Sequence, residues 1–131
     1  MKISNVIVKI STYLSGGGII PFVPEDRCDG YATVLISGGE EKVKSYAGGG
    51  ELFRIPVELK ITSDGGGAEG AIHVIEIFDK IAEYIKKNPL PIEGVEFSVC
   101  GTVRKSATFS GGIIEYTLPC AILYFIDGDE I

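Results

Sequence analysis

The sequence predicts an α+β domain in which one or two helices pack on one face of a mostly antiparallel β-sheet. A run of apolar residues at helical spacing over residues 71–87 lies between two long segments, 31–62 and 95–126, where apolar and polar residues largely alternate. The chain has 131 residues, of which 45% are hydrophobic and 23% charged. This size and composition indicate a single domain over residues 1–131 that buries roughly two-thirds of its unfolded surface. No internal sequence repeat stands out.

The first segment, residues 3–14, permits two interpretations. Its apolar side chains recur at helical spacing, and the glycine run at residues 16–18 is a typical helix stop. Its many β-branched residues equally permit a strand. Pro21 and Pro24 then favour an extended connection, because the residue before a proline is pushed out of the α region.

Residues 31–37 are predicted to form a strand, and a glycine turn at 38–40 leads into a second strand at 41–46. The clearest strand covers residues 52–62, where one face is apolar and the other polar. Pro56 lies in its middle and cannot donate a hydrogen bond to a neighbouring strand. We therefore expect this strand to lie at a sheet edge or to be bulged at Pro56.

A helix is predicted over residues 71–87, docked on the sheet through an apolar stripe. Burying each large apolar side chain is worth roughly 1.5–3 kcal/mol, whereas a surface ion pair contributes only about 0.2–0.5 kcal/mol. Residues 95–103 are predicted to form a strand, 104–112 a loop, and 113–126 a long strand that is apolar on both faces and therefore central. The expected stripe consists of Ile72, Ile75, Phe78, Ile81, Ala82 and Ile85.

Charge and cysteine usage exclude several classes of function. The formal net charge is −6 with only 12 Lys and Arg, so direct nucleic-acid binding is not expected. No stretch reaches the roughly 20 apolar residues that a membrane span needs, and the N-terminus lacks the pattern of a signal peptide. Cys28, Cys100 and Cys120 are far apart, which favours reduced, partly buried thiols over a disulfide framework or a zinc site.

The glycine-rich segment 65–70 formally matches GxGxxG, a motif that places a pyrophosphate at a helix N-terminus in dinucleotide-binding folds. The preceding strand alternates polar and apolar residues, unlike a buried parallel strand, so we interpret the segment as a strand-to-helix loop. His73 is the only histidine and has no evident catalytic partner. The acidic residues at 25, 26 and 29 lack EF-hand spacing. We therefore expect no catalytic residue, cofactor or metal, and a protein that is not an enzyme.

The order of the predicted elements is distinctive: an apolar N-terminal segment, a proline-containing loop, a β-hairpin, one helix and a second β-hairpin. This layout is carried by residues 31–37, by 52–62 leading into 71–87, and by 116–124. It resembles the tail terminator (tail completion) and related minor capsid proteins of tailed bacteriophages. The resemblance covers most of the chain as a layout of elements, without a fingerprint motif.

The resemblance implies a structural protein that forms a ring, often a hexamer, which caps the tail tube and joins it to the head. It also implies contacts with tail-tube and head–tail connector proteins, and a location in the tail or neck of the virion after synthesis in the host cytoplasm. We expect the contacts between copies to use the polar face of the strand at 52–62 and the loop at 46–50. The residues expected there are Arg54, Glu58, Lys60, Tyr46, Gly48, Gly49 and Gly50.

Two other functions remain open from the sequence. The chain is alternatively a small ligand-binding or enzymatic α+β domain that uses the loop from Gly65 to Gly70. A third hypothesis is an adaptor whose edge strand recruits a partner peptide by strand addition.

Overall fold

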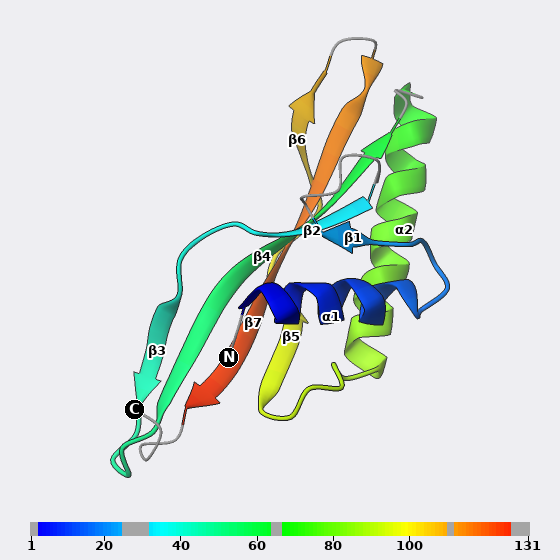
Figure 1. Ribbon diagram of the computed structural model, residues 1–131. Coiled ribbons are helices and arrows are strands. Elements are labelled where there is room, and N and C mark those ends of the chain that lie inside the picture. Colours follow the sequence, from blue (N-terminus) through cyan, green and yellow to red (C-terminus); the bar gives the residue numbers. More distant parts are fainter. Residues whose placement is uncertain (1–2, 25–31, 64–66, 110–111, 127–131) are drawn as a thin grey trace.

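The structure, a computed structural model, describes residues 3–24, 32–63, 67–109 and 112–126 (Figure 1). In these residues, two helices and seven strands form an α+β fold, which confirms the predicted fold class. The elements in chain order are α1 (Ile3–Ser15), β1 (Val23–Pro24), β2 (Ala32–Ile36), β3 (Glu41–Ser45), β4 (Glu51–Ser63), α2 (Gly67–Lys87), β5 (Val95–Val99), β6 (Arg104–Thr108) and β7 (Ile114–Ile126). Residues 3–14, which permitted a helix or a strand, are helical.

Two long antiparallel strands, β4 and β7, form the centre of the sheet and pair along their whole 13-residue length. Each has two short strands on its outer side. β2 and β3 follow one another along β4, and β5 and β6 do the same along β7. The short β1 adds a parallel strand outside β2. The sequence predicted a loop over residues 104–112, but residues 104–108 form a strand because they pair with the outer edge of β7.

The prediction that the strand containing Pro56 is an edge or bulged strand is wrong. β4 has neighbours on both sides, and its register with β7 passes through Pro56 without a shift. β2 pairs with residues 57–61 and β3 with residues 51–54, so Pro56 lies in the gap between them. Its carbonyl accepts a hydrogen bond from Ser37 N at 3.0 Å. Proline has no backbone N–H to donate, and in this gap no ladder hydrogen bond is lost as a result. A proline therefore fits a central strand where one neighbour ends and the next begins.

Pro119 lies in the same situation in β7. β5 pairs with residues 120–124 and β6 with residues 114–117, so the proline again falls between two short strands. Its carbonyl accepts from Cys100 N at 3.0 Å. The register of β7 against β4 is continuous here as well, so β7 has no bulge at Pro119 on that side.

The three strands β2, β3 and β4 recur as β5, β6 and β7 at a constant spacing. They begin at residues 32, 41 and 51, and their counterparts begin at 95, 104 and 114, each 63 residues later. Their lengths agree pair by pair, and in each half the proline follows the start of the long strand by five positions. The chain therefore contains an internal structural repeat, which the sequence alone did not reveal because few paired positions carry the same residue.

Fine details of the backbone repeat as well. In each half the residue at the start of the hairpin tip donates its N–H to the carbonyl four positions on: Tyr46 to Gly50 at 2.8 Å, and Phe109 to Ile113 at 2.7 Å. The outer strands β3 and β6 have register shifts at matching positions, after Lys42 and after Lys105. The hairpin tips also match, because Gly49 and Gly112 both have positive φ angles, of 96° and 80°.

Both helices pack on the same face of the sheet and share one core with it. α1 lies against β1 and β2, whereas α2 lies against β4 and β5 (Figure 1). Their buried faces correspond at a spacing of 71 residues, which pairs Ile7, Ile10, Tyr13 and Leu14 with Phe78, Ile81, Tyr84 and Ile85. Two members of the predicted stripe, Ile72 and Ile75, are exposed instead, because Val74 takes the inward position in that turn.

Candidate functional site

Three of the predicted contact residues, Arg54, Glu58 and Lys60, lie on the face of the sheet opposite the helices. They alternate along β4 with the buried residues of the core, such as Val57 and Leu59, and therefore point the other way. We call this surface the open face. Neither described helix covers it.

Two ion pairs within the chain join four charged side chains of the open face. Lys60 Nζ lies 3.4 Å from Glu115 Oε1, and Arg104 Nη2 lies 2.9 Å from Glu58 Oε2. Arg54 donates from Nη2 to the Sγ atom of Cys100 at 3.5 Å. The predicted contact residues on this face are thus held in place by neighbours. In both pairs the carboxylate partner is half-buried, and of the two cations only Arg104 is exposed.

In the middle of the open face, glycines lie directly against the two central prolines. A Cβ atom at position 38 would be 2.8 Å from Cγ of Pro56, and one at position 101 would be 2.5 Å from Cγ of Pro119. Real Cβ atoms do not approach other atoms so closely. Gly38 and Gly101 are therefore required by packing, and they occupy matching positions in the two halves.

The other predicted contact residues, Tyr46, Gly48, Gly49 and Gly50, form the tip of the hairpin between β3 and β4. Tyr46 is 41% exposed and meets Phe125 edge-on, with ring centroids 5.6 Å apart. Lys44 Nζ lies 5.0 Å from the centre of the Tyr46 ring, within cation–π range. Gly49 has a positive φ that other residues rarely adopt. Gly50 lies directly against the Phe125 ring.

Sequence reasoning did not find Phe125 as a partner of this tip. Phe125 lies near the end of β7, 79 positions after Tyr46, and is brought there by the pairing of Leu52 with Phe125 across the two central strands. It is 49% exposed. The only sequence signal was the apolar character of both faces of β7, which indicated a covered strand and not an exposed aromatic group.

A second surface that the sequence missed lies on the outward side of α2. Ile72 and Ile75 are 56% and 43% exposed, unusual values for large aliphatic side chains. The acidic side chains of Glu69, Glu76 and Asp79 are exposed on the same turns. The first three turns of α2 thus carry an apolar and acidic surface that no described part of the chain covers.

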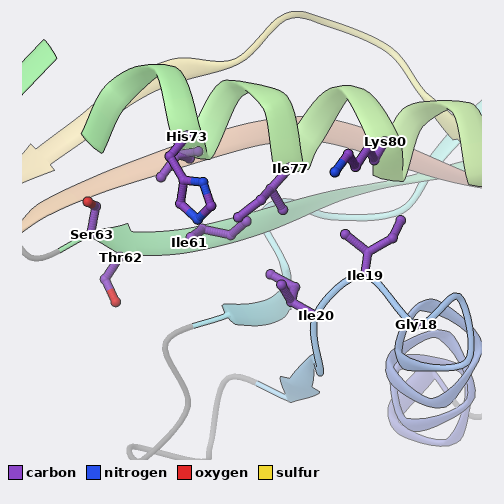
Figure 2. A pocket seen from close by; sticks show the side chains of 10 residues that line it. Gly18, Ile19, Ile20, Ile61, Thr62, Ser63, His73, Ile77 and Lys80 are labelled. Atoms are coloured by element: carbon purple, nitrogen blue, oxygen red, sulfur yellow. The ribbon is translucent and has the colours of Figure 1, made fainter. Parts of the chain in front are cut away.

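A hollow of about 760 Å³ lies between α2, β4 and the segment that follows α1 (Figure 2). Its polar side chains come from Thr62 and Ser63 of β4 and from His73 and Lys80 of α2. Figure 2 shows the His73 ring directed from the helix towards the strand. The apolar lining consists of Ile19, Ile20, Ile61, Val74 and Ile77. His73, interpreted from the sequence as a residue of the helix start, therefore also borders a cavity.

The glycine-rich segment 65–70 is only partly placed. Residues 64–66 lie outside the described chain, whereas Gly67 begins α2. Gly70 lies beside Ser63, whose Oγ would be 3.1 Å from a Cβ atom at position 70. Gly70 thus lies beside a residue that lines the hollow.

The described residues contain no group of three or more His, Cys, Asp or Glu side chains able to hold a metal ion. The acidic cluster at 25, 26 and 29 and Cys28 lie outside them. Cys100 is exposed and Cys120 buried. Burial, and secondarily the nearby Cys100, raises the pKa of the Cys120 thiol, so this sulfur stays protonated. No helix in the described ranges has the length and apolar character that crossing a bilayer requires.

A comparison with protein-family models found no match for this chain, and a search of curated proteins found no significant match either. Each surface must therefore be judged by its own chemistry. The charges of the open face are largely satisfied within the chain, whereas the hairpin tip and the outward side of α2 expose large apolar groups.

Proposed function

We propose that this protein is a structural component of a tailed bacteriophage or prophage, of the tail terminator or minor capsid type. In this proposal it assembles with copies of itself into a ring that caps the tail tube and joins it to the head. The observation that supports it is the pair of hairpins, β3–β4 and β6–β7, which lie at opposite ends of the sheet (Figure 1). Each ends in an exposed aromatic side chain, Tyr46 or Phe109.

Exposed aromatic groups at projecting tips favour a protein that contacts other proteins. Large apolar side chains gain free energy when a partner removes them from water, at roughly 25 cal/mol per Å² of buried apolar area. Tyr and Phe are enriched at protein interfaces for this reason. The layout also agrees with the resemblance, because a helix and a β-hairpin precede α2 and a second β-hairpin follows it.

The test is the mass of the purified protein across concentration, by light scattering coupled to size exclusion, followed by electron microscopy of the assembled fraction. We expect concentration-driven assembly towards a closed oligomer of about six copies, as in the family that the chain resembles, and ring-shaped particles. A protein that stays monomeric at the highest concentration and does not bind isolated tail tubes would contradict the proposal.

A second candidate function is a small ligand-binding domain, and the hollow beside α2 favours it. Lys80 and His73 lie at its wall together with the hydroxyl groups of Thr62 and Ser63, a set suited to an anionic ligand. Thermal melting with inorganic phosphate and a panel of nucleotides tests it. A ligand that raises the melting temperature of the wild type and not of Lys80→Ala supports this function, and unchanged melting across the panel rejects it.

A further inference from the structure

We infer that copies of this chain associate head to tail, with the tip of the β3–β4 hairpin of one copy against the outward side of α2 of the next. This inference rests on the proposed function and assigns the surfaces that join neighbouring copies. We call the first surface the tip patch and the second the helix patch. The tip patch consists of Lys44, Tyr46 and Phe125, and the helix patch of Glu69, Ile72, Ile75, Glu76 and Asp79.

The two patches lie at opposite ends of the molecule. β4 starts at Glu51, directly after the tip, and ends at Ser63, four residues before α2 begins at Gly67. At about 3.3 Å per residue, a strand of this length spans roughly 40 Å. Figure 1 shows the tip and the start of α2 at the two ends of the sheet. The patches therefore cannot cover each other within one chain, whereas they can do so between chains.

The apolar parts of the two patches are of similar extent. Tyr46 and Phe125 form a contiguous pair of half-exposed rings on the tip patch. Ile72 and Ile75 lie three positions apart on α2 and so project from neighbouring turns of the helix. A pair of aromatic rings set against two aliphatic side chains is a typical centre for a protein interface.

The charges around these centres have opposite sign. Lys44 lies over the Tyr46 ring, with its Nζ atom 5.0 Å from the ring centre, and Glu69, Glu76 and Asp79 are exposed beside the isoleucines. The ion pairs that join described residues involve none of these four side chains. Opposite charges around an apolar centre orient the partners and disfavour contact between two copies of the same patch.

The second hairpin tip does not fit the same role. Phe109, the counterpart of Tyr46, is 48% exposed, but Ala107 occupies the position that corresponds to Lys44. This tip also lies at the end of the sheet where α2 begins, because Ile114 pairs with Ser63. It therefore shares an end with the helix patch and serves as a matched control.

A contact between two different patches is heterologous. A growing row of copies then has an unpaired tip patch at one end and an unpaired helix patch at the other. Association therefore continues until a ring closes or a filament forms. An interface of one patch with itself would instead stop at a dimer. The head-to-tail arrangement thus supplies the polarity that a closed ring of identical copies needs.

The experiment measures assembly by light scattering for the wild type, for Lys44→Glu, for Glu76→Lys/Asp79→Lys and for an equimolar mixture of these two variants. Each variant alone should need at least about tenfold more protein to reach half-assembly. The mixture should restore assembly, because every contact in an alternating chain then joins opposite charges. Tyr46→Ala should weaken assembly to a similar degree, and the control Phe109→Ala should not. Melting temperatures close to that of the wild type show that each variant is folded.

A wild type that assembles, with charge variants that assemble equally well, overturns the head-to-tail contact and leaves the proposed function standing. Charge variants that fail to assemble and are not rescued by mixing overturn it too, since direct pairing of the two patches predicts rescue. A wild type that remains a monomer overturns the inference, whereas the proposed function is then decided by whether the protein binds isolated tail tubes. Loss of assembly in Phe109→Ala, with no effect of Tyr46→Ala, would move the contact to the second tip.

Discussion

Val57 of β4 and Cys120 of β7 lie directly opposite one another, and each is the counterpart of the other in the internal repeat. Two equivalent residues that face each other in antiparallel strands mark a local two-fold axis between them. The pairs on either side obey the same axis, since Phe53 faces Tyr124 and its counterpart Tyr116 faces Ile61. The two halves of the chain thus meet as the two subunits of a symmetric dimer do, through one self-complementary contact.

The same symmetry places the two helices side by side on one face. Tyr13 of α1 and Tyr84 of α2 are counterparts, and their rings lie 5.2 Å apart. Their hydroxyl groups bond differently: Tyr84 donates to the carbonyl of Tyr13 at 3.0 Å, and Tyr13 donates to the carbonyl of Asn88. The symmetry is therefore approximate, and it is broken where α2 extends to 21 residues against 13 in α1.

The facing positions of Val57 and Cys120 predict that Val57→Cys forms a disulfide with Cys120. Opposite residues in antiparallel strands have Cα atoms about 4.5–5.5 Å apart, within the range that disulfides span. Refolding under oxidising conditions, followed by intact-mass measurement and thiol counting, checks this. Leu59→Cys is the control, because its opposite residue is Leu118. Equal oxidation of both variants would contradict the pairing.

Gly101→Ala should destabilise the protein by about 1–3 kcal/mol, because its Cβ atom would collide with the Pro119 ring. The cost should shrink in a Pro119→Ala background, which lacks the ring carbon. Urea unfolding of the two single variants and the double variant measures this coupling. Gly39→Ala is the control, since a Cβ atom at position 39 meets nothing within 4 Å. Additive effects at 101 and 119 would show that the contact is not the cause.

The stability of the protein should fall as pH rises above about 9. Burial, with a smaller effect of Cys100, raises the pKa of the Cys120 thiol, and burial together with Tyr84 raises the pKa of Tyr13 to about 12. Below pH 9 both groups are neutral in the folded and unfolded chain. Above it the unfolded chain releases protons first, starting from ordinary values of 9.0 and 10.0, so alkaline pH favours unfolding.

Urea-unfolding midpoints from neutral pH to about pH 12 measure this decline. The Cys120→Ala variant should lose the part of the decline that begins near pH 9, whatever its absolute stability, because it has no thiol to ionise at that position. Tyr13→Phe should keep that part and lose the part that begins near pH 10. An unchanged pH profile in Cys120→Ala would contradict the assignment.

Replacing Arg54 and Lys60 with Glu is predicted to weaken assembly if the open face contributes to contacts between copies. Lys60→Glu alone also places two carboxylates where Lys60 and Glu115 now pair, which would lower the stability of the fold itself. The variant Lys60→Glu/Glu115→Lys restores the pair and still changes the sign at each position. Unchanged assembly of this variant and of Arg54→Glu, measured by light scattering, would exclude the open face from the contact.

The sequence sufficed for elements whose signal is local. The alternation in β4 and the helical spacing in α2 each act within a few residues, and such signals gave α2 and most strands, whereas residues 3–14 permitted a helix or a strand. The strand β6 was missed because its five residues are polar or small and are held by pairing with β7. Ile72 was assigned to the core because its spacing fits the apolar stripe. Which residues of a stripe are buried depends on where the sheet ends beneath the helix.

The candidate surfaces were predictable only in part. Tyr46 and the glycines of its hairpin were expected as a contact from the exposed character of the loop. Phe125 joins them only because β4 and β7 pair over their whole length, which is a long-range property. The partners of Arg54, Glu58 and Lys60 likewise come from β6, β7 and the turn before β6, and no spacing within β4 could indicate them.

The sequence by itself determined the α+β class, the position of α2 and the proline in the middle of each long strand, because hydrophobic periodicity and backbone restrictions are local. The tertiary structure decided that residues 3–14 form a helix and not a strand. The tertiary structure alone decided that the two prolines mark gaps between neighbouring strands, and that the two halves are related by a two-fold axis through Val57 and Cys120. Strand pairing depends on contacts between residues far apart in the chain. These contacts form because they bury one core to which several segments contribute, so the pattern of a single segment does not predict them.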